Sequence, residues 1–109
     1  MNQLVKESNV RVLVCGDRNW AHKGFMRRIL GQVLMPGDIV IQGEARGADL
    51  MAKGIALSLG FEVLSFPAQW EKHGRAAGPI RNRQMLVEGD ARLVLAFHNH
   101  IEESRGRRT

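Results

Sequence analysis

Short apolar segments typical of strands alternate along this chain with segments of helical periodicity, and this alternation constrains the fold most. The pattern predicts strands at residues 10–15, 39–42, 61–66 and 92–97, and helices at 22–34, 48–59 and about 78–88. Strands that alternate with helices imply right-handed βαβ crossovers and a parallel sheet. Nearly continuous apolar strands are typical of sheets buried on both faces. We therefore predict an α/β three-layer sandwich, with a parallel sheet of about four strands and helices on both faces.

The size and composition fit one domain in a reducing compartment. The chain has 109 residues, so residues 1–109 are expected to form a single domain with its own core. Its single cysteine, Cys15, has no internal disulfide partner, and the first residues do not resemble a signal peptide. No apolar run approaches the roughly 20 residues of a membrane span, so we expect a cytoplasmic protein without membrane contact.

Glycine, arginine and helix starts recur after the predicted strands. Residues 16–20, 43–49 and 78–83 follow the first, second and third strands, and ligands of parallel sheets bind at these carboxyl ends. Glycine lets the backbone approach a ligand, helix N-termini offer free N–H groups, and arginine matches phosphate oxygens. The net charge of +5 also favours anionic partners. The spacing fits neither the Walker A loop nor the Gly-x-Gly-x-x-Gly fingerprint, so the sequence predicts an anion site of another kind.

Four strings in these segments are more specific than the pattern. They are Cys-Gly-Asp-Arg-Asn-Trp, Gly-Glu-Ala-Arg-Gly-Ala-Asp, Phe-Pro-Ala-x-Trp and Ala-Gly-Pro-Ile-Arg-Asn-Arg-Gln-Met-Leu. Together they resemble the SLOG superfamily, and most closely its small YspA/YpsA-related proteins of phages and bacteria, over residues 10–97. The resemblance implies a Rossmann-like fold that binds nucleotides or nucleotide-derived molecules. Relatives include LOG phosphoribohydrolases, the single-strand DNA binder DprA and sensors of NAD-derived signals.

The resemblance implies a ligand-binding set, to which Glu44, inside the second string, is added. The set is Gly16, Asp17, Arg18, Gly43, Glu44, Arg46, Gly47, Asp49, Arg81, Asn82 and Met85.

Several of these residues have structural alternatives. Gly16 and Gly43 could simply terminate strands. Asp17 caps the next segment, orients Arg18 or contacts a ribose hydroxyl, and Arg46 binds ligand, pairs with Asp49 or is a surface arginine. Arg81 and Asn82 are expected in the first turn of a helix, where a basic residue makes sense beside an anion. Met85 is a core residue or a ligand contact.

Other side chains also leave alternatives open. Glu44 or Asp49 could serve as the general base of an N-glycosidase. Trp20 and Trp70 each follow a strand by a few residues, so one of them could stack on a base or pack as core. His98 and His100 flank Asn99 without a third ligand, and we expect no metal site.

The C-terminus departs from the pattern of the LOG enzymes. They carry Pro-Gly-Gly-x-Gly-Thr-x-x-Glu with a catalytic glutamate, whereas residues 104–109 read Ser-Arg-Gly-Arg-Arg-Thr. We therefore expect a C-terminally abbreviated, non-catalytic domain and name no catalytic residue. One sheet face or edge should be under-covered, which predicts a homodimer or higher oligomer. The basic tail, 102–109, is expected to be a solvated, frayed end.

These observations predict a module that senses or sequesters a phosphate-bearing nucleotide without a cofactor. The resemblance suggests a phage protein in the host cytoplasm that acts on an NAD-derived or cyclic nucleotide signal. A LOG-like nucleoside-monophosphate phosphoribohydrolase is the first alternative. Single-stranded nucleic-acid binding, prompted by the charge and the DprA relationship, is the second, and few aromatic residues support it.

Overall fold

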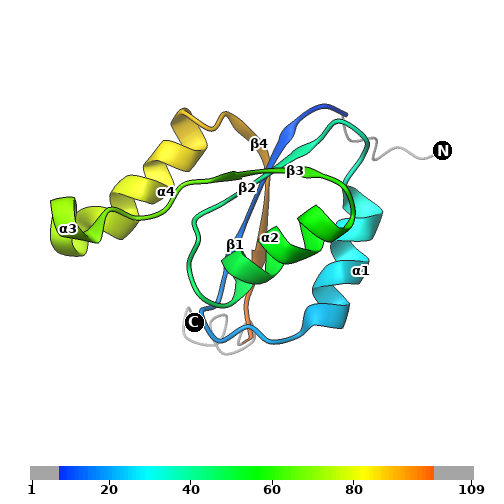
Figure 1. Cartoon of the computed structure of the whole chain (residues 1–109), viewed down its shortest axis with the longest axis horizontal. Helices are drawn as coiled ribbons and strands as arrows, with labels where there is room; N and C mark the ends of the chain where they lie inside the picture. Colours follow the sequence, from blue (N-terminus) through cyan, green and yellow to red (C-terminus); the bar gives the residue numbers. More distant parts are fainter. Residues whose placement is uncertain (1–7, 100–109) are drawn as a thin grey trace, which may run out of the picture.

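A computed structural model of the chain describes residues 8–99 (Figure 1). Strands and helices alternate in the order that the sequence predicts. The strands are β1 (Arg11–Gly16), β2 (Ile39–Gln42), β3 (Glu62–Ser65) and β4 (Ala91–Phe97). The helices are α1 (Lys23–Val33), α2 (Ala48–Ser58), α3 (Trp70–His73) and α4 (Ala77–Val87), with a 3₁₀ turn, η1 (Gly74–Ala76), before α4.

The four strands form one parallel sheet in the order β3-β2-β1-β4. Leu13 of β1 lies opposite Ile41 of β2 and Val94 of β4. The crossovers through α1 and α2 run outward from β1, whereas the crossover through α4 returns past β1 to the other side. Since βαβ crossovers are right-handed, this reversal puts α1 and α2 on one face and α4 on the other. The predicted Rossmann-like α/β sandwich is confirmed.

The main core lies between the sheet and the α1–α2 layer. Met26 and Leu30 of α1 and Ile55 of α2 are fully or almost fully buried against Val12 and Val40 of the sheet. Met26 and Leu30 are four residues apart in α1, and Ala48, Ala52 and Ile55 are three or four apart in α2, which places each set on one side of its helix. The α1–α2 layer therefore supplies most of the buried apolar surface.

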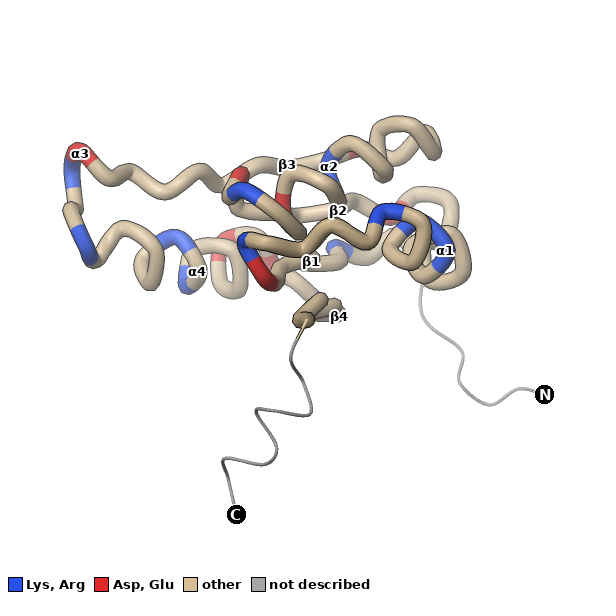
Figure 2. Tube along the Cα trace, turned by 90° about the horizontal axis from the view of Figure 1, so that it is seen from below, with Lys and Arg blue, Asp and Glu red and all other residues tan. Residues whose placement is uncertain are grey.

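The core under α4 is much smaller. Its buried residues are Leu13, Ile41 and Met85. Val94, on the same face of β4, is 48 % exposed. The side chains of Leu86 and Val87 on α4 are also largely exposed. In Figures 1 and 2, α3 and α4 extend away from the sheet at the end opposite α1. Part of this sheet face is thus uncovered by the described residues.

Two expectations about the segment after β3 are wrong. The basic stretch expected to be a loop contains α3 and η1, and four residues are too few to show a helical period. The following helix begins at Ala77 rather than at Gly78, so Pro79 is its third residue and still lies in the first turn, where no N–H partner is needed. The other predicted elements are found with shifts of at most one residue at their ends.

The 102–109 tail and His100 lie outside the described residues. Among residues 8–99, no helix has the length and apolar character needed to cross a bilayer.

Candidate functional site

A pocket of about 450 Å³ lies at the carboxyl ends of β1 and β2, between the loops that follow them and α4. It brings together all of the predicted site residues except Asp17 and Gly47. Its lining also includes residues that the prediction left out. The predicted members are Gly16, Arg18, Gly43, Glu44, Arg46, Asp49, Arg81, Asn82 and Met85, and the others are Cys15, Ala45, Pro67, Ala68 and Trp70.

The first loop, residues 17–22, is fastened by its backbone to the end of β4. Asp17 N donates to Phe97 O over 2.8 Å, and Gly16 has a φ of +150°. A Cβ at residue 16 would collide with the Phe97 carbonyl, so glycine is required by the neighbouring strand. The Asp17 carboxylate accepts the Asn19 N–H at 2.8 Å, which closes a local turn. Asp17 thus takes the capping role that the sequence left open.

The second loop, residues 43–47, packs backbone to backbone against the first. Gly47 has a φ of +86°, and a Cβ there would meet the carbonyl oxygens of Asp17 and Arg18. Beside it, Ala48 N donates to Asp17 O over 3.1 Å. Gly47 therefore joins the two loops instead of lining the pocket.

Asp49 supports the second loop from within. Its carboxylate accepts the N–H groups of Gly43 and Ala45 at 3.1 and 3.4 Å, and the residue is 5 % exposed. Burial raises the pKa of Asp49, and the two backbone N–H groups and the Arg81 charge oppose this rise. Among residues 8–99, Asp49 bonds to the loop backbone and not to Arg46, so it holds the loop's shape.

Glu44 is held by a polar network at the edge of the pocket. Its carboxylate accepts bonds from Lys53 Nζ at 2.7 Å, Ser65 Oγ at 2.6 Å and Gln42 Nε2 at 3.0 Å. These bonds, that of Lys53 foremost, lower the pKa of Glu44 to about 2. A carboxylate so strongly stabilised in its charged form is a poor proton acceptor, which disfavours Glu44 as a general base.

Arg81 reaches from α4 to the second loop. Its guanidinium donates to the Gly43 carbonyl and, over 2.9 Å, to Asn82 Oδ1. It occupies the space that a side chain at residue 43 would need. Because α4 begins at Ala77, Arg81 and Asn82 lie in the second turn, so their expected place in the first turn is wrong. The helix dipole acts mainly within the first turn and is not a reason for an anion here.

Arg18 and Arg46 stand at the mouth of the pocket, one from each loop. Both are exposed, and within residues 8–99 neither has a hydrogen-bond or ion-pair partner. Both also line a second groove, between α1 and α2. The neighbouring carboxylates of Glu44 and Asp49 already accept other hydrogen bonds. The two unpaired guanidinium groups are therefore suited to bind an anion.

The two tryptophans have different environments. Trp20 is 8 % exposed, and its ring centroid lies 5.4 Å from that of Phe97. Trp70, the first residue of α3, is 59 % exposed and lines the pocket. Trp70 is thus the tryptophan available for stacking. The Phe-Pro-Ala-x-Trp string was the signal that pointed to it, although the predicted set omitted it.

The apolar end of the pocket includes Met85 and Cys15. Met85 is 2 % exposed and belongs to the small core under α4, so it is both a core residue and part of the lining. Cys15 is half-buried at the end of β1, and burial raises the pKa of its thiol. Among the described residues no cluster of three His, Cys, Asp or Glu side chains is arranged to hold a metal ion.

A comparison with known protein families matches the part of the chain that contains both loops. The family model described as YspA, cpYpsA-related SLOG family matches residues 10–73, which contain β1 to α3 and both loops. The Gene 61 protein of Mycobacterium phage D29 is 38 % identical over 95 residues, covering 80 % of this chain and 75 % of that protein. No solved structure matches the chain significantly. Membership of this family indicates, at a coarse level, binding or processing of a nucleotide-related ligand. On the family match and this identity, the chain belongs to the YspA, cpYpsA-related SLOG family.

Proposed function

We propose that the chain binds a phosphate-bearing nucleotide in the pocket at the ends of β1 and β2, and senses or sequesters it without consuming it. The observation that carries the proposal is the state of the charged groups. Arg18 and Arg46 have no partner among residues 8–99. The carboxylate of Glu44 is bound to Lys53, and that of Asp49 is bound to the loop backbone. The pocket therefore has free positive charge and no free carboxylate, and a phosphate suits it.

The rest of the lining supports a nucleotide over inorganic phosphate. Trp70, Pro67, Ala68 and Met85 contribute apolar surface to the same pocket. An exposed indole stacks well on a flat heterocycle, with a contribution of about 1–3 kcal/mol per base. A ligand with phosphate at one end and a base at the other uses both kinds of surface.

The engaged carboxylates also favour binding over hydrolysis. An N-glycosidase needs a carboxylate that is free to accept a proton or to stabilise the departing sugar, and Glu44 already accepts three hydrogen bonds. Similarity to a protein of Mycobacterium phage D29 supports a role during phage infection. There the ligand that we propose is an NAD-derived or cyclic nucleotide signal.

Thermal-shift measurements followed by chromatography test the proposal. The panel comprises AMP, ribose 5-phosphate, NAD, ADP-ribose, cyclic ADP-ribose isomers and cyclic dinucleotides. We expect at least one nucleotide to raise the melting temperature more than ribose 5-phosphate does, and to be recovered intact. Arg46→Ala should weaken its binding by about 1–3 kcal/mol through loss of a charged hydrogen bond.

Arg83→Ala is the matched control, because Arg83 is an exposed arginine of α4 that does not line the pocket. It should bind like the wild type. No stabilisation by any compound, or equal binding by Arg46→Ala and wild type, would contradict the proposal. Release of free base would replace it with the hydrolase alternative.

A further inference from the structure

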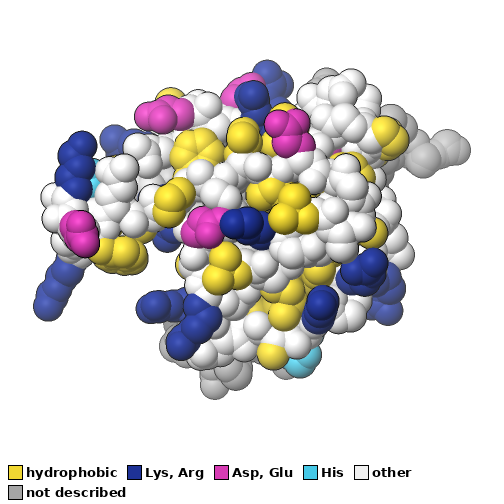
Figure 3. Space-filling model, viewed as in Figure 1, with side chains coloured by type: hydrophobic (Ala, Val, Ile, Leu, Met, Phe, Trp, Pro, Cys, Tyr) yellow, Lys and Arg dark blue, Asp and Glu magenta, His cyan; other side chains and the backbone are white. Residues whose placement is uncertain are grey.

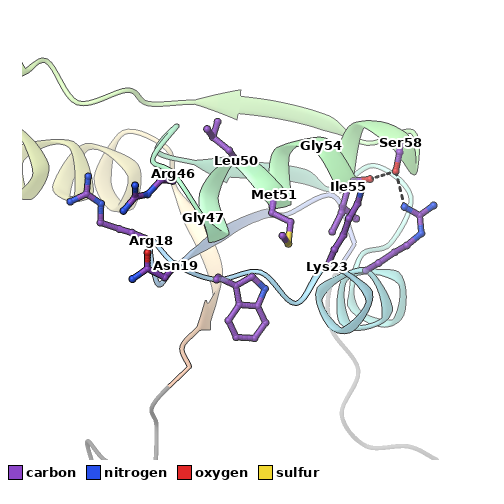
Figure 4. A pocket seen from close by; sticks show the side chains of 12 residues that line it. Arg18, Asn19, Lys23, Arg46, Gly47, Leu50, Met51, Gly54, Ile55 and Ser58 are labelled. Carbon is purple, nitrogen blue, oxygen red and sulfur yellow. Dashed lines mark hydrogen bonds between the residues drawn. The ribbon is translucent and has the colours of Figure 1, made fainter.

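A second, larger groove of about 690 Å³ runs along the outer side of α2, where α2 meets α1 (Figure 4). Arg18, Arg46 and Gly47 lie at one end of it, and Lys23, Gly54 and Ser58 lie toward the other. Ala48–Ser58 is an 11-residue helix, so at 1.5 Å per residue the groove follows it for about 16 Å. This is long enough for more than one nucleotide.

The charged side chains of this groove are all basic. Arg18, Lys23, Arg27 and Arg46 line it, and no acidic residue is among the lining. Arg27 donates to Ser58 Oγ over 3.2 Å, a neutral partner that leaves its charge uncompensated. In Figure 3, blue side chains flank the α1–α2 region, and most magenta ones lie over the other elements, with one magenta side chain beside a blue one at the edge of α2. The groove is therefore expected to attract an anion.

Between the basic ends, the groove is apolar. Leu50 is 44 % exposed and Met51 is partly exposed, whereas Ile55 and Trp20, which also line the groove, are almost fully buried. Simple polyphosphate would leave this surface in water, whereas a nucleotide base would cover it. The groove thus combines the two chemical properties of the first pocket, a cationic part and an apolar part.

Arg18 and Arg46 line both sites, so the groove and the pocket adjoin at these two side chains. A phosphodiester held by these two arginines would have one nucleotide on either side. We propose, building on the proposed function, that the pocket and the groove together also bind a linear phosphodiester of at least two nucleotides, more tightly than the pocket alone binds a mononucleotide. One nucleotide occupies the pocket, and the next lies in the groove with its phosphate near Lys23 and Arg27.

Calorimetric titration separates the two sites. The probes are the four ribonucleoside 5′-monophosphates and the four corresponding 5′-phosphorylated homodinucleotides. We expect the dinucleotide of the preferred base to bind at least tenfold more tightly than its monophosphate. The double variant Lys23→Ala/Arg27→Ala should remove this gain and change the affinity for the monophosphate less than twofold.

Arg28→Ala/Arg83→Ala removes the same amount of charge outside both sites and should keep the gain. A dinucleotide that binds no more tightly than the monophosphate overturns the inference and leaves the proposed function standing; a groove for an acidic peptide would give this result. A gain that survives Lys23→Ala/Arg27→Ala also overturns it. If no monophosphate and no dinucleotide binds, this inference fails, and the proposed function is then decided by the NAD-derived and cyclic compounds of the thermal-shift panel.

Discussion

The two faces of the sheet differ in how they are covered. On one face, α1 and α2 bury a continuous set of apolar side chains, among them Met26, Leu30 and Ile55. On the other, α4 buries little more than Leu13, Ile41 and Met85, and the space at the strand ends remains open as the pocket. The comparison indicates a division of roles. The α1–α2 face supplies most of the stability, and the α4 face gives up packing for a binding site.

The strongest challenge to this comparison is a matched pair of truncations. Leu30→Ala leaves a closed cavity in the main core and should lower the free energy of unfolding by about 2–5 kcal/mol. Met85→Ala should cost less, near the lower end of that range, because the space it leaves opens into the pocket and admits water. Urea denaturation followed by circular dichroism measures both. Equal losses would mean that the two faces contribute alike.

The pH dependence of stability tests whether the hydrogen bonds around Glu44, at the edge of the pocket, stabilise the fold. The pKa of Glu44 is lowered from 4.5 to about 2 in the folded chain, so the unfolded chain binds more protons between these values. The stability that Glu44 contributes is present above about pH 4.5 and should be lost as the pH falls toward 2. Unfolding free energies at several pH values should therefore show the advantage of wild type over Glu44→Gln shrinking across this window.

Glu71→Gln, on exposed α3, is the control for that series and should show no such trend. A difference between wild type and Glu44→Gln that stays constant from pH 6 to pH 2 would argue against the bonds from Lys53, Ser65 and Gln42 as the cause.

The sequence predicted the elements and the loops better than the roles of single residues. The strands and long helices have enough apolar residues to show a period. The glycine–arginine loops follow parallel strands, whose carboxyl ends lie at the same edge of the sheet. The role of Gly16 depends on Phe97, and that of Gly47 depends on Asp17, contacts that exist only once the strand order is known. For the same reason, the bonds that engage Glu44 could not be read from local sequence.

The smallest expected effect concerns the uncovered part of the α4 face. Val94→Asp should change the free energy of unfolding by less than about 0.5 kcal/mol in dilute solution, since Val94 is half exposed. If the predicted homo-oligomer forms through this face, it buries Val94, and a charged aspartate there weakens the association. Sedimentation equilibrium at rising concentration should then show weaker association for Val94→Asp than for wild type. Unchanged self-association would place the interface elsewhere on the molecule.

The backbone contacts between the first and second loops also bear on how the site can evolve. The loops are joined through Gly47, the Asp17 carbonyl and the Ala48 N–H, so their relative position depends on main-chain atoms. Side chains at residues 18, 19, 45 and 46 project from this frame without holding it together. Mutations at these positions can therefore accumulate without loss of the fold. Relatives could diverge in ligand preference by exchanging a few side chains on an inherited scaffold.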